Sequence, residues 1–269
     1  MTPPGYRPLR IPLGGLMRPF VVQLPTRQAT SATMVHLLGE PPVSVGDGRH
    51  RVPEGSKRLL AYVALKHGRV ERMRVAGVLW PEADDRRAAG NLRSALWRLR
   101  GAHIDVLTTD KDSLSLRPDV DVDVRAVERW ADRLIGGRSG PEDGIAPGEL
   151  SGAIDLLPGW YDDWVIAERE RLRQRVLHAM ESLGHQLTST GRHAEAIDAA
   201  IMAIDADPLR ESAHRVLIEA HLAEGNWVEA RSSFAMLRRM TLRELGVEPS
   251  PGLWRMIDLE SGAPVSALR

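Results

Sequence analysis

An amphipathic helix is predicted between Arg86 and Arg100. Apolar residues recur there every three or four positions and would form one face toward a core: Ala88, Ala89, Leu92, Ala95, Leu96 and Leu99. The opposite side and its flanks are polar and strongly basic: Arg86, Arg87, Gly90, Asn91, Arg93, Ser94, Trp97 and Arg98. Taken alone, this pattern fits two structures equally, a solvated surface helix rich in arginine or a recognition helix that lies in a DNA groove. The neighbouring segments favour the second.

Two shorter helices are predicted immediately before this basic helix. The first covers residues 56–67, and its core face would consist of Leu59, Leu60, Val63 and Ala64. The second covers residues 71–79 and ends near Pro81, because proline lacks the amide donor that a helix needs. Asp84 or Asp85 can then cap the basic helix. The loop between the second and third helices is short, as a helix-turn-helix requires.

Short β-like runs flank this helical triplet on both sides. Three runs precede it, separated by turn residues, and would form an N-terminal sheet: residues 35–38, 43–45 and 51–52. Two runs follow it, 104–109 and 114–116, and predict a hairpin around a polar turn. Behind a recognition helix, a hairpin is the wing of a winged helix-turn-helix. Lys111 lies at its tip, where it would either contact a DNA phosphate or remain a solvated turn lysine.

Aspartate and valine alternate over residues 119–124. Alternating carboxylates can mark a calcium loop, but that loop needs glycine at its sixth position and glutamate at its twelfth. Those positions hold Val124 and Trp130 in this chain. We therefore expect a strand with its carboxylates facing solvent, or a linker, that leads into a helix at about residues 125–134.

A repeat organises the second half of the chain. After a glycine-rich loop or hinge at 136–148, the segment 191–196 recurs at 225–230, and the offset of 34 residues is the period of tetratricopeptide repeats. The match is partial, since Leu187 and His221 replace the usual aromatic residues. Further helices are expected on either side of the repeat, at 168–178 and 253–259. Stacked helix pairs of this kind form a concave surface that usually binds protein.

Charge is segregated along the chain, although the formal net charge of all 269 residues is zero. Residues 55–101 hold eleven Lys and Arg against four Asp and Glu, a net charge of +7, whereas residues 141–260 hold twelve Arg against twenty-one Asp and Glu, a net charge of −9. The basic block fits anion binding and the acidic block fits a different partner. The absence of cysteine fits a reducing cytoplasm. No apolar run has membrane-spanning length, so no membrane partner is expected.

The sequence carries none of the common catalytic or cofactor signatures. It has no glycine-rich phosphate loop, no dinucleotide-binding glycine pattern and no H-E-x-x-H motif. His178 and His185, like His214 and His221, are seven residues apart and would share a helix face, but no third metal ligand accompanies either pair. We therefore expect no cofactor, no metal and no enzymatic activity. The rival to a DNA-binding protein is a tetratricopeptide scaffold whose basic helix binds an acidic protein partner.

Taken in order, these stretches resemble the SARP-type bacterial transcriptional activators, the antibiotic regulatory family. The resemblance covers roughly residues 34–260 and rests on these segments: 57–65, 79–81, 89–100, 120–123, Trp164 with 168–172, 207–211 and 244–251. The last segment, Glu-Leu-Gly-Val-Glu-Pro-Ser-Pro, is the most specific. One departure concerns the wing. The family often has a Gly-Tyr pair at the start of the second wing strand, where this chain has Ser113 and Leu114.

We expect a mainly α-helical protein in three parts. Residues 1–33 contain six prolines and no periodicity, which predicts a disordered extension, with Met34 as a candidate start. Residues 34–120 would form the winged helix-turn-helix, an α+β domain similar to that of OmpR. Residues 121–269 would form an all-α, tetratricopeptide-like bacterial transcriptional activation domain. Larger family members carry a nucleotide-binding module, so this chain is expected to be a short, stand-alone member.

The resemblance implies a sequence-specific activator. Family members bind direct repeats of double-stranded DNA near promoters and recruit RNA polymerase with its sigma factor, typically for secondary-metabolite gene clusters. A second protomer on tandem sites and a cytoplasmic, nucleoid-associated location are further expectations. The expected DNA-binding residues are Arg86, Arg87, Asn91, Arg93, Ser94, Trp97, Arg98, Arg100 and Lys111. Trp97 would pack on a sugar or a thymine methyl group, or rest against the wing or a second protomer.

Overall fold

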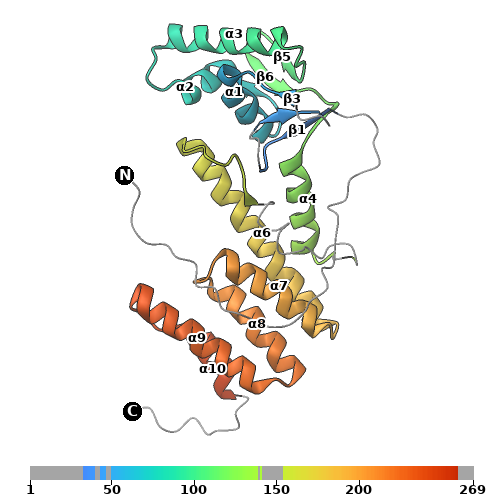
Figure 1. The fold of residues 1–269 in the computed structure, drawn as a ribbon, viewed down its shortest axis with the longest axis vertical. Coiled ribbons are helices and arrows are strands. Elements are labelled where there is room, and N and C mark those ends of the chain that lie inside the picture. Colours follow the sequence, from blue (N-terminus) through green and yellow to red (C-terminus); the bar gives the residue numbers. More distant parts are fainter. Residues whose placement is uncertain (1–32, 40–42, 47–49, 139, 141–153, 260–269) are drawn as a thin grey trace.

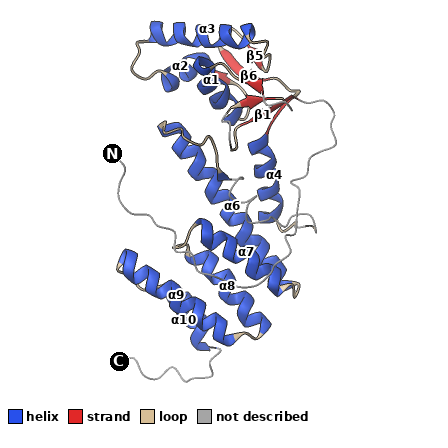
Figure 2. Cartoon of the chain, viewed as in Figure 1, coloured by secondary structure: helices blue, strands red, loops and turns tan. Residues whose placement is uncertain are grey.

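The computed structural model describes residues 33–39, 43–46, 50–138, 140 and 154–259. A small α+β part forms one end of the molecule, and a column of helices extends away from it (Figure 1, Figure 2). The predicted fold class is therefore confirmed. No helix within these ranges combines the length and apolar character needed to cross a bilayer.

The N-terminal sheet has the strand order β3-β2-β1-β7. Its strands are β1 (Thr33–His36), β2 (Ser44–Val45), β3 (His50–Arg51) and β7 (Val120–Val122). Strand β1 pairs antiparallel with β2 and parallel with β7, so Val35 lies opposite both Val45 and Val122. The three predicted N-terminal strands are confirmed, and the aspartate–valine alternation forms a fourth. The extension expected at 1–33 lies outside the described residues except for Thr33, which pairs with Val120.

Asp123 does not face solvent, contrary to the prediction from its alternating pattern. Its carboxylate accepts hydrogen bonds from the amides of Leu37 (2.9 Å), Leu38 (3.0 Å) and Val124 (2.8 Å) at the start of helix α4 (Asp123–Ile135). Burial raises the pKa of Asp123 above its ordinary value, although the amide donors and the nearby His36 oppose this shift. The carboxylate thus ties the end of β1 to α4 because the strand leaves amides without strand partners there.

The helical triplet is confirmed close to its predicted bounds as α1 (Glu54–Leu65), α2 (Arg72–Leu79) and α3 (Asp85–Gly101). The hairpin strands β5 (Leu107–Thr109) and β6 (Ser113–Leu116) join a short strand that was not predicted, β4 (Val70–Glu71). Leu114 pairs with both Val70 and Thr109 and is buried. The wing strand therefore forms around Leu114 without the Gly-Tyr pair.

Within the described ranges, the column consists of α4 and the helices α6 (Asp163–Ser189), α7 (His193–Ala206), α8 (Glu211–Glu224), α9 (Trp227–Leu245) and α10 (Pro251–Leu259). Helix α6 is much longer than the predicted helix at 168–178, whereas α10 lies close to its prediction. Most of the predicted loop at 136–148 lies outside the described residues.

One close helix crossing fixes the register of the repeat. Helix α6 approaches α8 so closely at Gly184 that a Cβ atom there would lie 2.4 Å from Cγ1 of Val216. Glycine is therefore required by the packing at position 184, since only glycine lets the two backbones approach in this way.

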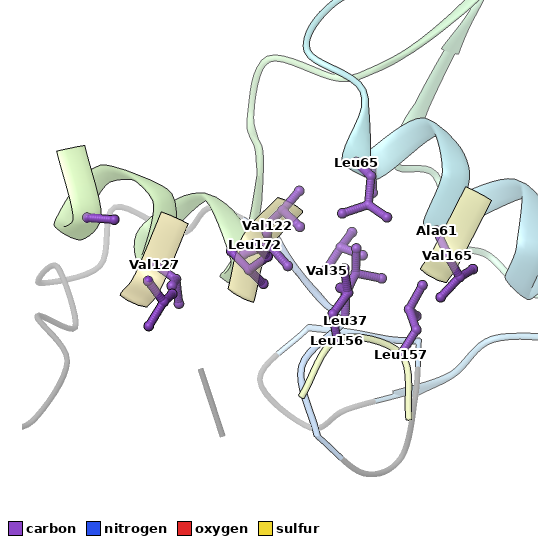
Figure 3. Close-up of a cluster of buried hydrophobic side chains, with 14 of the residues drawn as sticks. Val35, Leu37, Ala61, Leu65, Val122, Val127, Leu156, Leu157, Val165 and Leu172 are labelled. Carbon is purple, nitrogen blue, oxygen red and sulfur yellow. The ribbon is translucent and has the colours of Figure 1, made fainter. Parts of the chain in front are cut away.

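The α+β part and the column share one hydrophobic core (Figure 3). The segment before α6 inserts Leu156 and Leu157 beside Leu37, and both leucines are buried. A β-bridge joins Leu38 to Leu156, and the amide of Leu157 donates to the carbonyl of Leu37 at 2.9 Å. Arg169 of α6 secures this segment by donating to three of its carbonyl groups.

Ion pairs surround this shared core. Lys66 Nζ lies 2.6 Å from the Glu168 carboxylate, and Arg58 lies 2.8 Å from Asp162. Burial disfavours the charged form of Glu168, but Lys66 and Arg171 outweigh it and hold the pKa of Glu168 below its ordinary value. These contacts fix the orientation of the α+β part relative to α6.

Candidate nucleic-acid interface

Helix α3 lies across the end of the molecule that is remote from α9 and α10 (Figure 1). Its inner face is buried, as predicted, through Ala88, Leu92, Ala95, Leu96 and Leu99, while Ala89 is only partly covered. The hydroxyl of Ser56 on α1 donates to the carbonyl of Ala95 at 2.8 Å inside this contact. The inner face therefore holds α3 against the core and leaves its outer face open to solvent.

Asp84, rather than Asp85, caps α3. Its carboxylate accepts a hydrogen bond from the amide of Arg87 at 2.8 Å, which satisfies one of the free donors in the first turn. The cap fixes where the basic face begins, because Arg86 and Arg87 lie in the first turn after it.

Loss of this cap has a measurable consequence. The substitution Asp84→Ala is expected to lower the free energy of unfolding by about 1 kcal/mol, since it removes the acceptor of the Arg87 amide. Urea denaturation followed by circular dichroism measures the change. Asp85→Ala is the matched control and should have a smaller effect, because Asp85 only adds charge near the helix N-terminus. Equal losses in the two variants would contradict the assignment of the cap.

The eight candidate residues of α3 all have exposed side chains: Arg86, Arg87, Asn91, Arg93, Ser94, Trp97, Arg98 and Arg100. The side chain of Trp97 is 74% exposed, so it does not rest against the wing of its own chain. Lys111 is also exposed, in the turn between β5 and β6. The structure thus groups the α3 residues on one surface and puts Lys111 on the neighbouring hairpin.

Three of the α3 arginines contact their own fold. Arg87 lies 3.6 Å from the Asp84 carboxylate, Arg98 donates to the carbonyl of Gly55 at 3.3 Å, and Arg100 donates to the Thr109 hydroxyl at 3.2 Å. Arg98 therefore bridges α3 to the first turn of α1, and Arg100 bridges it to the wing.

Arg86 and Arg93 differ from these three. Among the residues that the structure describes, neither guanidinium group forms an ion pair or a hydrogen bond. They are seven residues apart, and Trp97 follows Arg93 by four, so the three side chains lie along one edge of the outer face. This edge presents two unpaired cations and one exposed indole to solvent.

Two further arginines support the wing turn and were missed in the sequence. Arg69 lies 3.4 Å from the Asp110 carboxylate, and Arg72 donates to the Asp110 carbonyl at 3.4 Å. Both flank β4, whose two residues are too short a run to reveal a strand by alternation. The positive surface thus continues from α3 to the residues beside Lys111.

The two histidine pairs do not converge on a site. His185 contacts Glu219 at 2.9 Å, and this carboxylate raises the pKa of His185. His214 is buried, which lowers its pKa, with Nε2 2.9 Å from the carbonyl oxygen of Pro208. Within the described ranges, no three His, Cys, Asp or Glu side chains are grouped as a metal site would need.

Comparisons with known proteins find similarity over most of this chain. Residues 147–258 match the family described as the bacterial transcriptional activator domain. The chain is 29% identical over 214 residues to the regulatory protein AfsR of Streptomyces coelicolor, an overlap of 73% of this chain and 21% of that protein. It is 28% identical over 229 residues to AfsR of Streptomyces griseus, covering 79% of this chain and 23% of that protein. The chain therefore spans less than a quarter of the length of these relatives.

A solved structure has the same fold. Mycobacterium tuberculosis EmbR, in complex with a low affinity phosphopeptide, superimposes with a TM-score of 0.65 at 21% identity, over 86% of this chain and 65% of that one. At this level of identity the likeness concerns the architecture alone, an α+β part followed by a helical column.

Proposed function

We propose that α3 binds in the major groove of double-stranded promoter DNA. The chain belongs to the SARP-type family of bacterial transcriptional activators, which supports this proposal. The observation that carries the proposal is the outer face of α3, which is exposed and rich in arginine while the inner face is locked into the core. The surrounding block of residues 55–101 has a net charge of +7, which would attract the phosphate backbone.

The proposed DNA-binding residues are the exposed polar and aromatic side chains of α3 together with the wing lysine: Arg86, Arg87, Asn91, Arg93, Ser94, Trp97, Arg98, Arg100 and Lys111. Arginine can pair with guanine through two hydrogen bonds or neutralise a phosphate, and asparagine can pair with adenine. Lys111 is proposed to reach a phosphate beside the groove, supported by its place next to Arg69 and Arg72.

The finer parts of the function are also proposals. They comprise binding to direct repeats with a second protomer on the tandem site, recruitment of RNA polymerase with its sigma factor by the acidic column, and control of a secondary-metabolite gene cluster. The protein would act without catalysis of its own and would be found with the nucleoid. These proposals are supported by the family, whose described members are regulatory proteins.

Arg93→Ala is expected to weaken binding to the DNA upstream of its own gene about tenfold, because the free guanidinium of Arg93 would lose a base or phosphate contact. Fluorescence anisotropy over a salt series measures both the affinity and the slope. The matched control is Arg239→Ala, which removes an exposed arginine from α9 and should change neither.

A second duplex of random sequence tests the alternative function. Tight, salt-dependent binding to the upstream DNA and weak binding to the random duplex would support the proposal. Equal, weak binding to both, unchanged by Arg93→Ala, would contradict it. The basic face would then be better explained as a surface of a tetratricopeptide scaffold for an acidic protein.

A further inference from the structure

We propose that Trp97 helps to determine which DNA sequence α3 binds, by packing against the C5 methyl group of a thymine in the major groove. This inference rests on the proposed function and adds a specific role for one side chain. The remaining recognition would fall to the unpaired Arg86 and Arg93 on the same edge of the helix.

The exposure of Trp97 indicates that a binding partner covers this side chain. Tryptophan is a large side chain that is usually well covered, and exposing most of an indole to water forgoes the stabilisation that its burial would give. Yet Trp97 is 74% exposed on a helix whose other large apolar residues face the core. A contact made on binding would cover it.

On one side of Trp97, small residues leave the ring free to project. Ser94 lies one turn before it, Gly90 two turns before it, and Gly101 one turn after it on the outer face. None of these residues has a side chain long enough to cover an indole. Trp97 is therefore the most prominent apolar group on the surface that would enter the groove.

Two neighbouring parts of the chain could have covered Trp97, the wing and the first turn of α1, but both already contact arginines of α3. The wing is contacted by Arg100 through Thr109, and the first turn of α1 is contacted by Arg98 through Gly55. These two arginines lie on opposite flanks of α3, so each side of the outer face is held by its own fold. The surface between these two flanks, which includes Trp97, is left for the ligand.

The chemistry of the groove selects the partner of an indole. The edges of the four bases display nitrogen and oxygen donors and acceptors in the major groove, and the thymine methyl is the one apolar group among them. An indole offers a large apolar surface and a single donor, with no acceptor. It cannot make the paired hydrogen bonds by which arginine selects guanine, so its selective contact is with the methyl group.

The test begins with the full chain and a library of random-sequence duplexes, from which the bound sequences are selected and enriched. Single thymines in the enriched duplex are then replaced by deoxyuridine, which removes only the methyl group. At one thymine, the wild-type protein should lose about fourfold in affinity, the effect of one buried methyl group. Trp97→Ala should bind the thymine duplex several-fold more weakly and should not distinguish it from the deoxyuridine duplex.

Tyr161→Ala provides the control, because Tyr161 is an aromatic residue of similar exposure (80%) that lies outside α3. This variant should keep the full sensitivity to deoxyuridine. An unchanged deoxyuridine effect in Trp97→Ala, or the absence of any such effect in the wild type, would overturn the inference while leaving DNA binding intact. Failure of the library to enrich any sequence would instead overturn the proposed function and this inference together.

Discussion

Leu157→Ala is expected to lower the free energy of unfolding by about 4 kcal/mol, toward the upper end of the range for leucine truncations in a core. Leu157 is fully buried where the α+β part meets α6, and Figure 3 shows it near Val165 and Ala61. Its backbone also has a φ of 47°, in the left-handed region that costs a leucine about 1–2 kcal/mol. Alanine would keep this backbone cost and lose most of the burial that offsets it.

The whole chain should respond to this substitution, and not only the segment that contains it. Because one hydrophobic cluster runs from Val35 to Ala220, circular dichroism and tryptophan fluorescence should report a single urea transition that shifts to lower concentration. Tyr161→Ala, four residues away and exposed, should shift it little. Two separate transitions, with the helical column retaining its wild-type midpoint, would contradict the shared core.

Gly184→Ala is expected to destabilise the protein by about 2–3 kcal/mol, even though alanine is the better helix former by about 1 kcal/mol. The added Cβ would lie 2.4 Å from Cγ1 of Val216, and valine on a helix has no other favourable rotamer into which this methyl group can move. The helices α6 and α8 would have to separate, which loosens the packing on both sides of the crossing.

The double variant Gly184→Ala with Val216→Ala separates this clash from other effects. Val216→Ala alone leaves a small cavity and is expected to destabilise the chain. In the double variant the alanine at 184 occupies that space, so the total loss should be smaller than the sum of the single losses. Thermal unfolding of the four proteins measures the difference. Additive losses would show that the crossing is not as close as the 2.4 Å contact implies.

The sequence predicted best those elements that depend on local periodicity. The prediction of the basic helix was correct for its buried face and its exposed face and nearly correct for its bounds. Residues that recur at helical spacing define both faces at once. The repeat was recognisable because the segment 191–196 recurs at 225–230, with the period of tetratricopeptide repeats. The exposed side chains of the candidate site followed from the same pattern, so the sequence was sufficient to propose Arg86, Arg93 and Trp97 as outer-face residues.

The elements that depend on distant partners could not be predicted. Strand β4 has two residues and exists because β6 pairs with it. Asp123 points inward because the amides of Leu37 and Leu38, which follow β1, donate to its carboxylate. To predict that Leu156 and Leu157 insert into the α+β core, one would have to know that the chain returns there before α6. The difference between tethered and free arginines on α3 likewise depends on Gly55 and Thr109, which lie outside the helix.

The shared core has a consequence for the geometry of any assembly on DNA. The α+β part and α6 are joined by Leu156, Leu157 and the ion pair of Glu168, so the column is a rigid arm. The orientation of α3 in the DNA groove would therefore set the direction of this arm. B-form DNA turns once in about 10 base pairs, so moving the binding site by about five would swing that arm to the opposite side of the double helix. Rotational phase along the duplex, and not linear distance alone, would then govern what the far end of the arm can reach.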